Sequence, residues 1–255
     1  MTRPPPTPLV LVAHGSRDPR ALTTLTALRH AVQAKRPALD VRTGHIELTE
    51  PLLTDTLRGL GAPAVLVPLL LGHGHHATHD IPAAAATARP HGAPHRVAAP
   101  LGPHPLLSEA LRDRLAEAGW PGGAPPGGHG VVLAAAGSRD PGYAEDIRRA
   151  AALLARRVGA PVVPGYAAPT ARTPTTVPEA ARVLAARGAR HVAVASYFTA
   201  PGRFATEAAR AAPGLAAAPL GAHPALAALV LHRYDQARAA RPGGARAAGR
   251  PLTPV

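Results

Sequence analysis

The sequence predicts an α/β protein built from two tandem copies of one parallel-sheet unit. Internal repetition is the first observation: residues 9–20 (LVLVAHGSRDPR) recur as 131–142 (VVLAAAGSRDPG), and residues 98–105 (AAPLGPHP) recur as 217–224 (AAPLGAHP), in both cases after about 120 residues. The second observation is that short apolar segments alternate with segments of helical periodicity in each copy. That alternation indicates parallel strands covered by helices on both faces.

The first copy opens with a strand over residues 8–13, which leads through a Gly-Ser turn into a helix. The apolar residues of that helix recur at helical spacing and are expected on one face: Leu22, Leu25, Leu28 and Val32. The remaining elements expected in this copy are, in order, a strand over 41–48, a helix over 51–59 and a strand over 64–71.

The second copy repeats this order, beginning with a strand over residues 130–135. The helix after it carries its apolar face on Ile147, Ala151 and Leu154. The elements that follow are a strand over 162–168, a helix over 174–187 and a strand over 191–198.

The repeats and the composition divide the chain into four segments. We expect a first half over 1–119, a Pro/Gly linker over 120–130 (WPGGAPPGGHG), a second half over 131–238 and a tail over 239–255. The tail consists of Arg, Ala, Gly and Pro with hardly any apolar residue to bury, so we expect it to be disordered. Because fusing two halves can replace a dimer of single-length chains, a monomer is expected.

Composition limits the chemistry open to this chain. It contains no Cys, which excludes disulfides, iron–sulfur clusters and thiolate metal sites. The formal net charge of +13 suits nucleic acid, an anionic membrane surface or a polyacidic small molecule, and charge alone does not choose among them. The N-terminal residues hold no signal-peptide core and no stretch is apolar enough to span a membrane, so the expected location is the cytoplasm.

Polar residues gather where three strands of the first half end, and ligands of open α/β sheets bind at that edge. The three groups are His14 with Gly15, Ser16 and Arg17; His45 with Glu47 and Glu50; and His73, His75, His76, His79 and Asp80. Together they predict a site for a divalent metal of the Fe, Co, Ni or Zn type. Each group alone also fits a structural role, as a solvated loop, a strand-end histidine or carboxylates in the first turn of a helix.

These motifs resemble the double-length form of the sirohydrochlorin chelatases. The matching segments of the first half follow the order of that family and are HGSRDPR (14–20), IELTEP (46–51), PLLLGHGHHATHDIP (68–82) and APLGPHP (99–105). In the second half, AAGSRDP (135–141) and SYFTAPGRF (196–204) resemble the family's degenerate repeat.

The resemblance implies two flavodoxin-like halves that face each other across an active-site cleft. It implies a lyase that inserts ferrous iron or cobalt into a polycarboxylate tetrapyrrole, for siroheme or cobalamin synthesis, with the metal as a substrate and no organic cofactor. The family's metal-contacting and catalytic positions match His14, Glu47 and His76. The resemblance assigns no role to His73, His75 or His79.

The internal repeat supports a single metal site. His14 aligns with Ala136, His76 with Phe204, and Glu47 with Ala167 or Ala168, so the second half has lost all three groups. Arginines remain near the same loops, and we expect substrate carboxylates to be bound by Ser16, Arg17, Arg139 and Arg203. The shared Gly-Ser-Arg-Asp-Pro segments are equally consistent with turn and capping chemistry.

Three other classes of function are compatible with some of these features. A metal or tetrapyrrole carrier would use the same ligands as a chelatase, and product formation separates the two. A histidine phosphatase would require Arg before the nucleophilic His, whereas Ala13 precedes His14. Nucleic-acid binding rests on charge alone, because aromatic residues make up only 3% of the chain and stacking platforms are scarce. We therefore expect neither nucleic acid nor a membrane as a partner.

Overall fold

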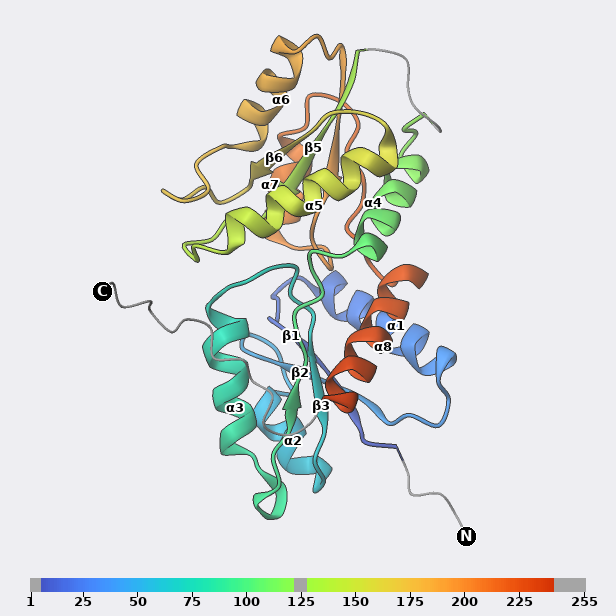
Figure 1. Ribbon diagram of the computed structural model, residues 1–255, viewed down its shortest axis with the longest axis vertical. Coiled ribbons are helices and arrows are strands. Elements are labelled where there is room, and N and C mark those ends of the chain that lie inside the picture. Colours follow the sequence, from blue (N-terminus) through green and yellow to red (C-terminus); the bar gives the residue numbers. More distant parts are fainter. Residues whose placement is uncertain (1–5, 122–127, 241–255) are drawn as a thin grey trace, which may run out of the picture.

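The computed structural model describes residues 6–121 and 128–240, which form two parallel sheets, one from each sequence copy (Figure 1). The first sheet has the order β2 (Val41–His45), β1 (Leu9–Ala13), β3 (Val65–Pro68), β4 (Arg96–Val97). The second has the order β6 (Val162–Tyr166), β5 (His129–Ala135), β7 (His191–Ser196). All strand pairs within the sheets are parallel, which confirms the predicted fold class.

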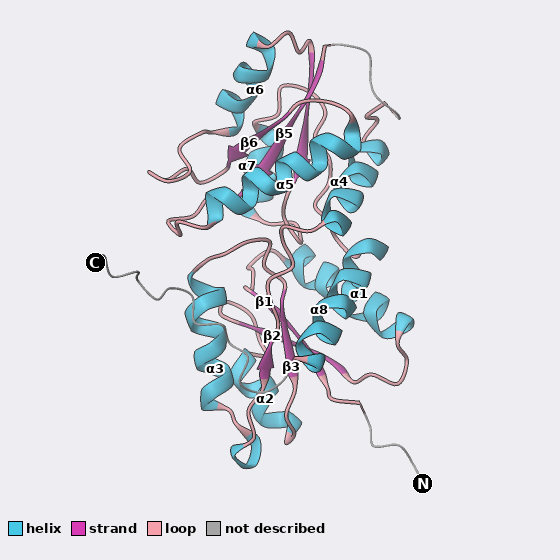
Figure 2. Ribbon diagram, viewed as in Figure 1, coloured by secondary structure: helices cyan, strands magenta, loops and turns pink. Residues whose placement is uncertain are grey.

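Helices cover both faces of the first sheet (Figure 2). Successive side chains of a strand point to opposite faces, so Leu9 and Leu11 of β1 pack on one side while Val10 and Val12 pack on the other. The elements that bury these faces are α1 (Pro19–Lys35), α2 (Leu53–Leu60), α3 (Ile81–Thr87) and α8 (Pro224–Ala239). Strands buried on both faces explain why the sequence reads as continuous apolar runs at these positions.

The second sheet is covered in the same way. Val132 and Ala134 of β5 pack against α6 (Val177–Ala186) and α7 (Arg203–Arg210). On the other face lie α4 (Pro105–Glu117) and α5 (Tyr143–Val158). The predicted apolar face of α5, formed by Ile147, Ala151 and Leu154, is buried.

The two copies exchange their last helices. In Figure 1, α8 at the end of the chain lies beside α1, and α4 lies beside α5. Arg36 at the end of α1 forms a two-pronged ion pair with Asp235 of α8 (Nη1–Oδ1 2.7 Å, Nη2–Oδ2 2.8 Å), and the Tyr234 hydroxyl of α8 donates to the Thr7 carbonyl at 2.7 Å. We call the first sheet with its covering helices the first lobe and the second sheet with its helices the second lobe. These lobes therefore differ from the sequence halves, 1–119 and 131–238, by one exchanged helix each.

Several predicted elements have different ends in the structure. The strands expected over 41–48, 64–71, 162–168 and 191–198 end earlier, because each pairs directly with β1 or β5, and those central strands stop at Ala13 and Ala135. The helix expected over 174–187 begins only at Val177, because Thr176 and Glu179 form a capping box there. Leu22, predicted on the buried face of α1, is 48% exposed, since it lies in the first turn next to the loop after β1.

Parts of the predicted linker and tail fall outside the described residues. Residues 122–127 of the 120–130 linker and residues 241–255 of the 239–255 tail are among them, while Ala239 ends α8. No helix within the described ranges is long and apolar enough to cross a membrane.

Candidate metal site at the junction of the two sheets

A glycine turn after β1 brings His14 next to Glu47. Gly15 has a φ of +102°, and a Cβ there would collide with the Glu47 carbonyl oxygen. The close approach is held by the Glu47 amide, which donates to the His14 carbonyl at 3.0 Å. As a result, His14 Nε2 lies 3.4 Å from Glu47 Oε1, and both side chains are about half exposed. Two side chains from separate strand ends are thus set side by side.

His76 reaches the same place from the loop after β3. It begins a π-helical turn (His76–Asp80) that runs directly into α3, and its ring centroid lies 4.6 Å from that of His14 with the rings nearly perpendicular. His76 Nδ1 lies 2.6 Å from Asp80 Oδ2. Because a carboxylate only accepts hydrogen bonds, it holds the proton on Nδ1 and leaves the Nε2 lone pair available to a metal. The sequence places Asp80 among the polar residues of the predicted metal site without a specific role, and its spacing four residues after His76 is the signal for this contact.

The structure therefore brings together the three side chains expected to bind metal. Within the described ranges, no group of three or more His, Asp or Glu side chains is already arranged so that it could hold a metal ion. The ligand role of His14, Glu47 and His76 remains a prediction, and it requires the half-exposed His14 and Glu47 side chains to reorient around an ion.

The second half repeats this glycine turn after β5, where it meets the loop after β6. Gly137 has a φ of +103°, and a Cβ there would collide with the Ala168 carbonyl oxygen. The Ala168 amide donates to the Ala136 carbonyl at 2.8 Å, as Glu47 does to His14. Ala136 and Ala168 thus occupy the positions of His14 and Glu47, which resolves the alignment of Glu47 that the sequence left open.

The position of His76 is also lost in the second half. The Thr78 amide donates to the Gly74 carbonyl, and the Thr206 amide donates in the same way to the Gly202 carbonyl. This shared bond aligns Gly74 with Gly202. His76 and Phe204 each lie two residues after that glycine, so Phe204 is the counterpart of His76. At these three positions, the side chains predicted to bind metal therefore lie on one side of the junction only.

Side chains from both copies meet at the edge of this site. Asp146 of α5 is buried, and its Oδ2 accepts the His73 amide at 2.8 Å and lies 2.6 Å from His73 Nδ1. The Tyr197 hydroxyl of the second lobe donates to the Leu71 carbonyl at 3.1 Å. Burial raises the pKa of Tyr197 far above its usual value, so this phenol stays a neutral donor. The loops after β3 and β7 are thus bonded across the junction.

The predicted substrate-binding residues lie on the loops around this junction. Ser16 shapes its own loop, since its Oγ accepts the Asp18 amide and its amide donates to Thr49 Oγ1. The other three side chains are exposed: Arg17 and Arg139 on the Gly-Ser turns, and Arg203 at the start of α7. The guanidinium of Arg203 lies 4.6 Å from the centre of the Phe204 ring.

Two of the residues grouped with the ligands by sequence have local roles instead. His45 is buried and its Nδ1 contacts the Pro51 carbonyl at 3.2 Å. Glu50 accepts the Leu52 amide at 3.1 Å, next to the start of α2. They fit the structural alternative that the sequence allowed for this group.

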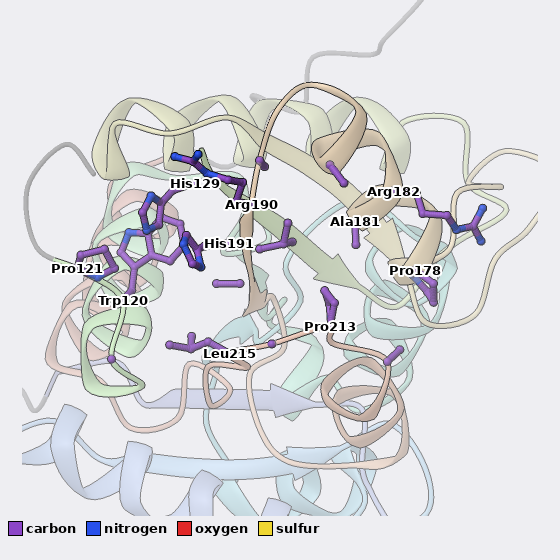
Figure 3. Close-up of a pocket in the computed structure, with 17 residues that line it drawn as sticks. Trp120, Pro121, His129, Pro178, Ala181, Arg182, Arg190, His191, Pro213 and Leu215 are labelled. Atoms are coloured by element: carbon purple, nitrogen blue, oxygen red, sulfur yellow. The ribbon is translucent and has the colours of Figure 1, made fainter. Parts of the chain in front are cut away.

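A pocket in the second lobe lies away from the candidate metal site (Figure 3). Among its lining residues are Trp120, His129, Arg190 and His191, and two of these, His129 and His191, begin strands β5 and β7. The pocket is therefore at the amino ends of the strands, whereas the candidate metal site is at the carboxyl ends of the first sheet.

Comparison with solved structures supports the fold. SirB from Bacillus subtilis with Fe3+ superimposes with a TM-score of 0.71 at 23% identity, covering 91% of this chain and 96% of that chain. CbiX, described as the terminal enzyme for biosynthesis of siroheme in denitrifying bacteria, gives a TM-score of 0.68 at 24% identity, with 90% and 99% covered.

Curated relatives match part of the chain. The chloroplastic sirohydrochlorin ferrochelatase of Arabidopsis thaliana is 34% identical over 113 residues, which is 42% of this chain and 50% of the relative. The sirohydrochlorin cobaltochelatase of Methanocaldococcus jannaschii is 37% identical over 78 residues, or 29% and 54%. The chain thus spans about half the length of the curated relatives it matches.

The CbiX family model matches residues 8–118 and again residues 130–237. Since both copies match this model, and together they make up most of the chain, the protein belongs to the CbiX family.

Proposed function

We propose that this protein is a sirohydrochlorin chelatase that inserts Fe2+ or Co2+ into its tetrapyrrole substrate. The observation that supports the proposal is that His14, Glu47 and His76 lie close together at one edge of the first sheet. The equivalent positions of the second half hold Ala136, Ala168 and Phe204. The names of the relatives from Arabidopsis thaliana and Methanocaldococcus jannaschii supply the substrate and the two metals.

In the proposed reaction, the metal substrate is bound by the ring nitrogens of His14 and His76 and by the Glu47 carboxylate. Imidazole and carboxylate suit borderline divalent ions, and a small ligand set allows the ion to be released to the macrocycle. Two pyrrole N–H protons must leave as the four ring nitrogens bind the metal. The imidazoles of His14 and His76 can accept those protons once they release the ion, and the negative charge of Glu47 favours their uptake.

We propose that the exposed arginines bind the carboxylates of the tetrapyrrole. Arg17 lies on the side of the metal ligands, whereas Arg139 and Arg203 come from the second copy. Guanidinium groups pair with carboxylates through two parallel hydrogen bonds, so they can orient a polycarboxylate ring. In this proposal the 1–119 half binds the metal, both halves contribute to holding the substrate, and the chain acts as a monomer in the cytoplasm.

The test is a metal-insertion assay with the purified full chain, sirohydrochlorin and either Fe2+ or Co2+ under anaerobic conditions. The visible absorbance of the macrocycle changes on metallation, and the rate is compared with that of the same mixture without protein. We expect turnover well beyond one equivalent of product per chain. Binding of tetrapyrrole or metal without acceleration of metallation would instead identify a carrier and overturn the proposal.

A further inference from the structure

Two histidines beside the candidate metal site are stacked on each other at the surface. His75 and His79 are four residues apart, a spacing that places both on one side of a helical turn. Their ring centroids are 4.6 Å apart and the rings are inclined by only 14°. Both residues are exposed. Neither belongs to the set formed by His14, Glu47 and His76.

The pair has the chemistry of a two-ligand site for a divalent metal. Two imidazoles at four-residue spacing on a helix can bind one ion together, as in helical metal-binding motifs. The Thr78 hydroxyl donates to the Gly74 carbonyl at 3.1 Å, so its oxygen accepts from His79 Nδ1, 2.7 Å away, and the Nε2 lone pair of His79 is left for a metal. His75 Nε2 lies 3.7 Å from Asp80 Oδ1, so the Asp80 carboxylate is close to the other ring of the pair.

Asp80 connects this pair to the candidate metal site. Its Oδ1 faces His75, and its Oδ2 lies 2.6 Å from His76 Nδ1. The ring of His76 in turn lies against that of His14. Groups that bind metals therefore follow one another from the exposed turn to the site beside Glu47.

We infer that His75 and His79 form a separate capture site, at which the divalent metal substrate is first bound before it passes to His14 and His76. The inference rests on the proposed function, in which the metal is a substrate that must enter from solution. Two protein ligands leave most of the coordination positions to water, so the ion is held weakly and can be handed on.

The test is calorimetric titration of the untagged full chain with Co2+, comparing wild type with two double variants. One double variant is H75Q with H79Q, and the other is H14A with H76A. An exposed histidine on α1 supplies the control H30Q. Wild type is expected to bind two Co2+ ions per chain, each double variant one, and H30Q two. The Co2+ concentration needed for half-maximal metal insertion should rise by about tenfold in H75Q/H79Q, with a larger loss of rate at limiting than at saturating Co2+.

An unchanged stoichiometry in H75Q/H79Q would overturn the capture site. The titration does not depend on metal insertion. If the H75Q/H79Q variant loses one Co2+ while wild type fails to metallate sirohydrochlorin, the metal site is real and the proposed chelatase function fails. If wild type metallates sirohydrochlorin and binds one ion that H75Q/H79Q still binds, the function stands and the capture site is rejected.

Discussion

His73 Nδ1 lies 2.6 Å from Oδ2 of Asp146, so a loop of the first copy is bonded to a buried carboxylate of the second. The same oxygen accepts the His73 amide at 2.8 Å. Asp146 is in the first turn of α5, where the helix dipole favours negative charge. The bond lies three residues before His76 and joins the two lobes at the edge of the candidate metal site.

Asp146→Asn is expected to destabilise the protein. The amide keeps the shape of the side chain but removes the charge that strengthens both bonds to His73, and a buried group with weakened bonds costs about 1–3 kcal/mol. The free energy of unfolding from urea titration of the full chain measures this loss. Glu145→Gln is the control, because the neighbouring Glu145 is more exposed than Asp146 and pairs with Arg149 on the helix surface. Equal unfolding midpoints for Asp146→Asn and Glu145→Gln would contradict the importance of the bond.

The two glycine turns offer a matched pair of variants. In both Gly15→Ala and Gly137→Ala, the new methyl group meets a carbonyl oxygen at a positive φ, so each should destabilise the protein by roughly 2 kcal/mol or more. Only Gly15→Ala moves the segment that carries Glu47. We expect both variants to lower the melting temperature, and Gly15→Ala alone to weaken Co2+ binding at a temperature where both remain folded. Equal Co2+ affinities in the two variants would argue against Glu47 as a ligand.

Asp80→Asn tests the orientation of His76. The neutral amide no longer fixes the proton on His76 Nδ1 through a charged hydrogen bond, so the metal-binding nitrogen is less well defined. We expect the Co2+ affinity of the site formed by His14, Glu47 and His76 to fall about 10- to 100-fold. Calorimetric titration measures the affinity, and circular dichroism checks that the fold persists. The exposed Asp55, which pairs with Arg58, gives the control Asp55→Asn, and an affinity of Asp80→Asn equal to that of this control would refute the role.

His104 gives a pH dependence of stability. Its Nδ1 accepts the Leu106 amide as the N-cap of α4, which requires a neutral ring. Burial lowers the pKa of His104, and the nearby Arg233 and His232 lower it further. As the pH falls below the ordinary histidine pKa of 6.5, His104 is therefore protonated in the unfolded chain at a higher pH than in the folded chain. This contribution to stability is complete above pH 6.5 and is lost as the pH falls toward the lower folded pKa.

His104→Asn should remove that dependence, because asparagine also caps helices but does not titrate. Urea unfolding at a series of pH values between 5 and 8 compares the two proteins. Wild type is expected to lose more stability than His104→Asn as the pH falls below about 6.5. Parallel curves for the two proteins would show that the cap does not depend on the protonation of His104.

Local patterns in the sequence predicted much of the fold and the grouping of the candidate ligands. The repeat and the apolar runs predicted two parallel sheets, and the rule that strand ends meet at one edge brought His14, Glu47 and His76 together. The exchange of α4 and α8 could not be predicted in this way. The apolar spacing of a helix indicates that one face is buried, but it does not indicate which of two similar sheets buries it.

Contacts between distant residues were also beyond the sequence. His73 and Asp146 belong to different copies, and no local pattern relates them. Leu22 fits the spacing of the buried face of α1 but lies in its first turn, so periodicity alone misplaced it. The sequence could not tell whether Glu50 is a metal ligand or a local hydrogen-bond acceptor. The structure shows the second, because the Leu52 amide donates to the Glu50 carboxylate.

If only the first copy binds the metal, substitutions in that copy alone should abolish metal insertion, and the initial rate of Co2+ insertion into sirohydrochlorin measures this. The variants to compare are His14→Ala, His76→Ala and, in the second copy, Phe204→Ala, which changes the counterpart of His76. Circular dichroism selects conditions in which all three are folded. We expect the insertion rates of His14→Ala and His76→Ala to fall to the rate without protein, and the rate of Phe204→Ala to stay near that of wild type. Wild-type rates in His14→Ala and His76→Ala would rule out metal binding by the first copy as the basis of insertion.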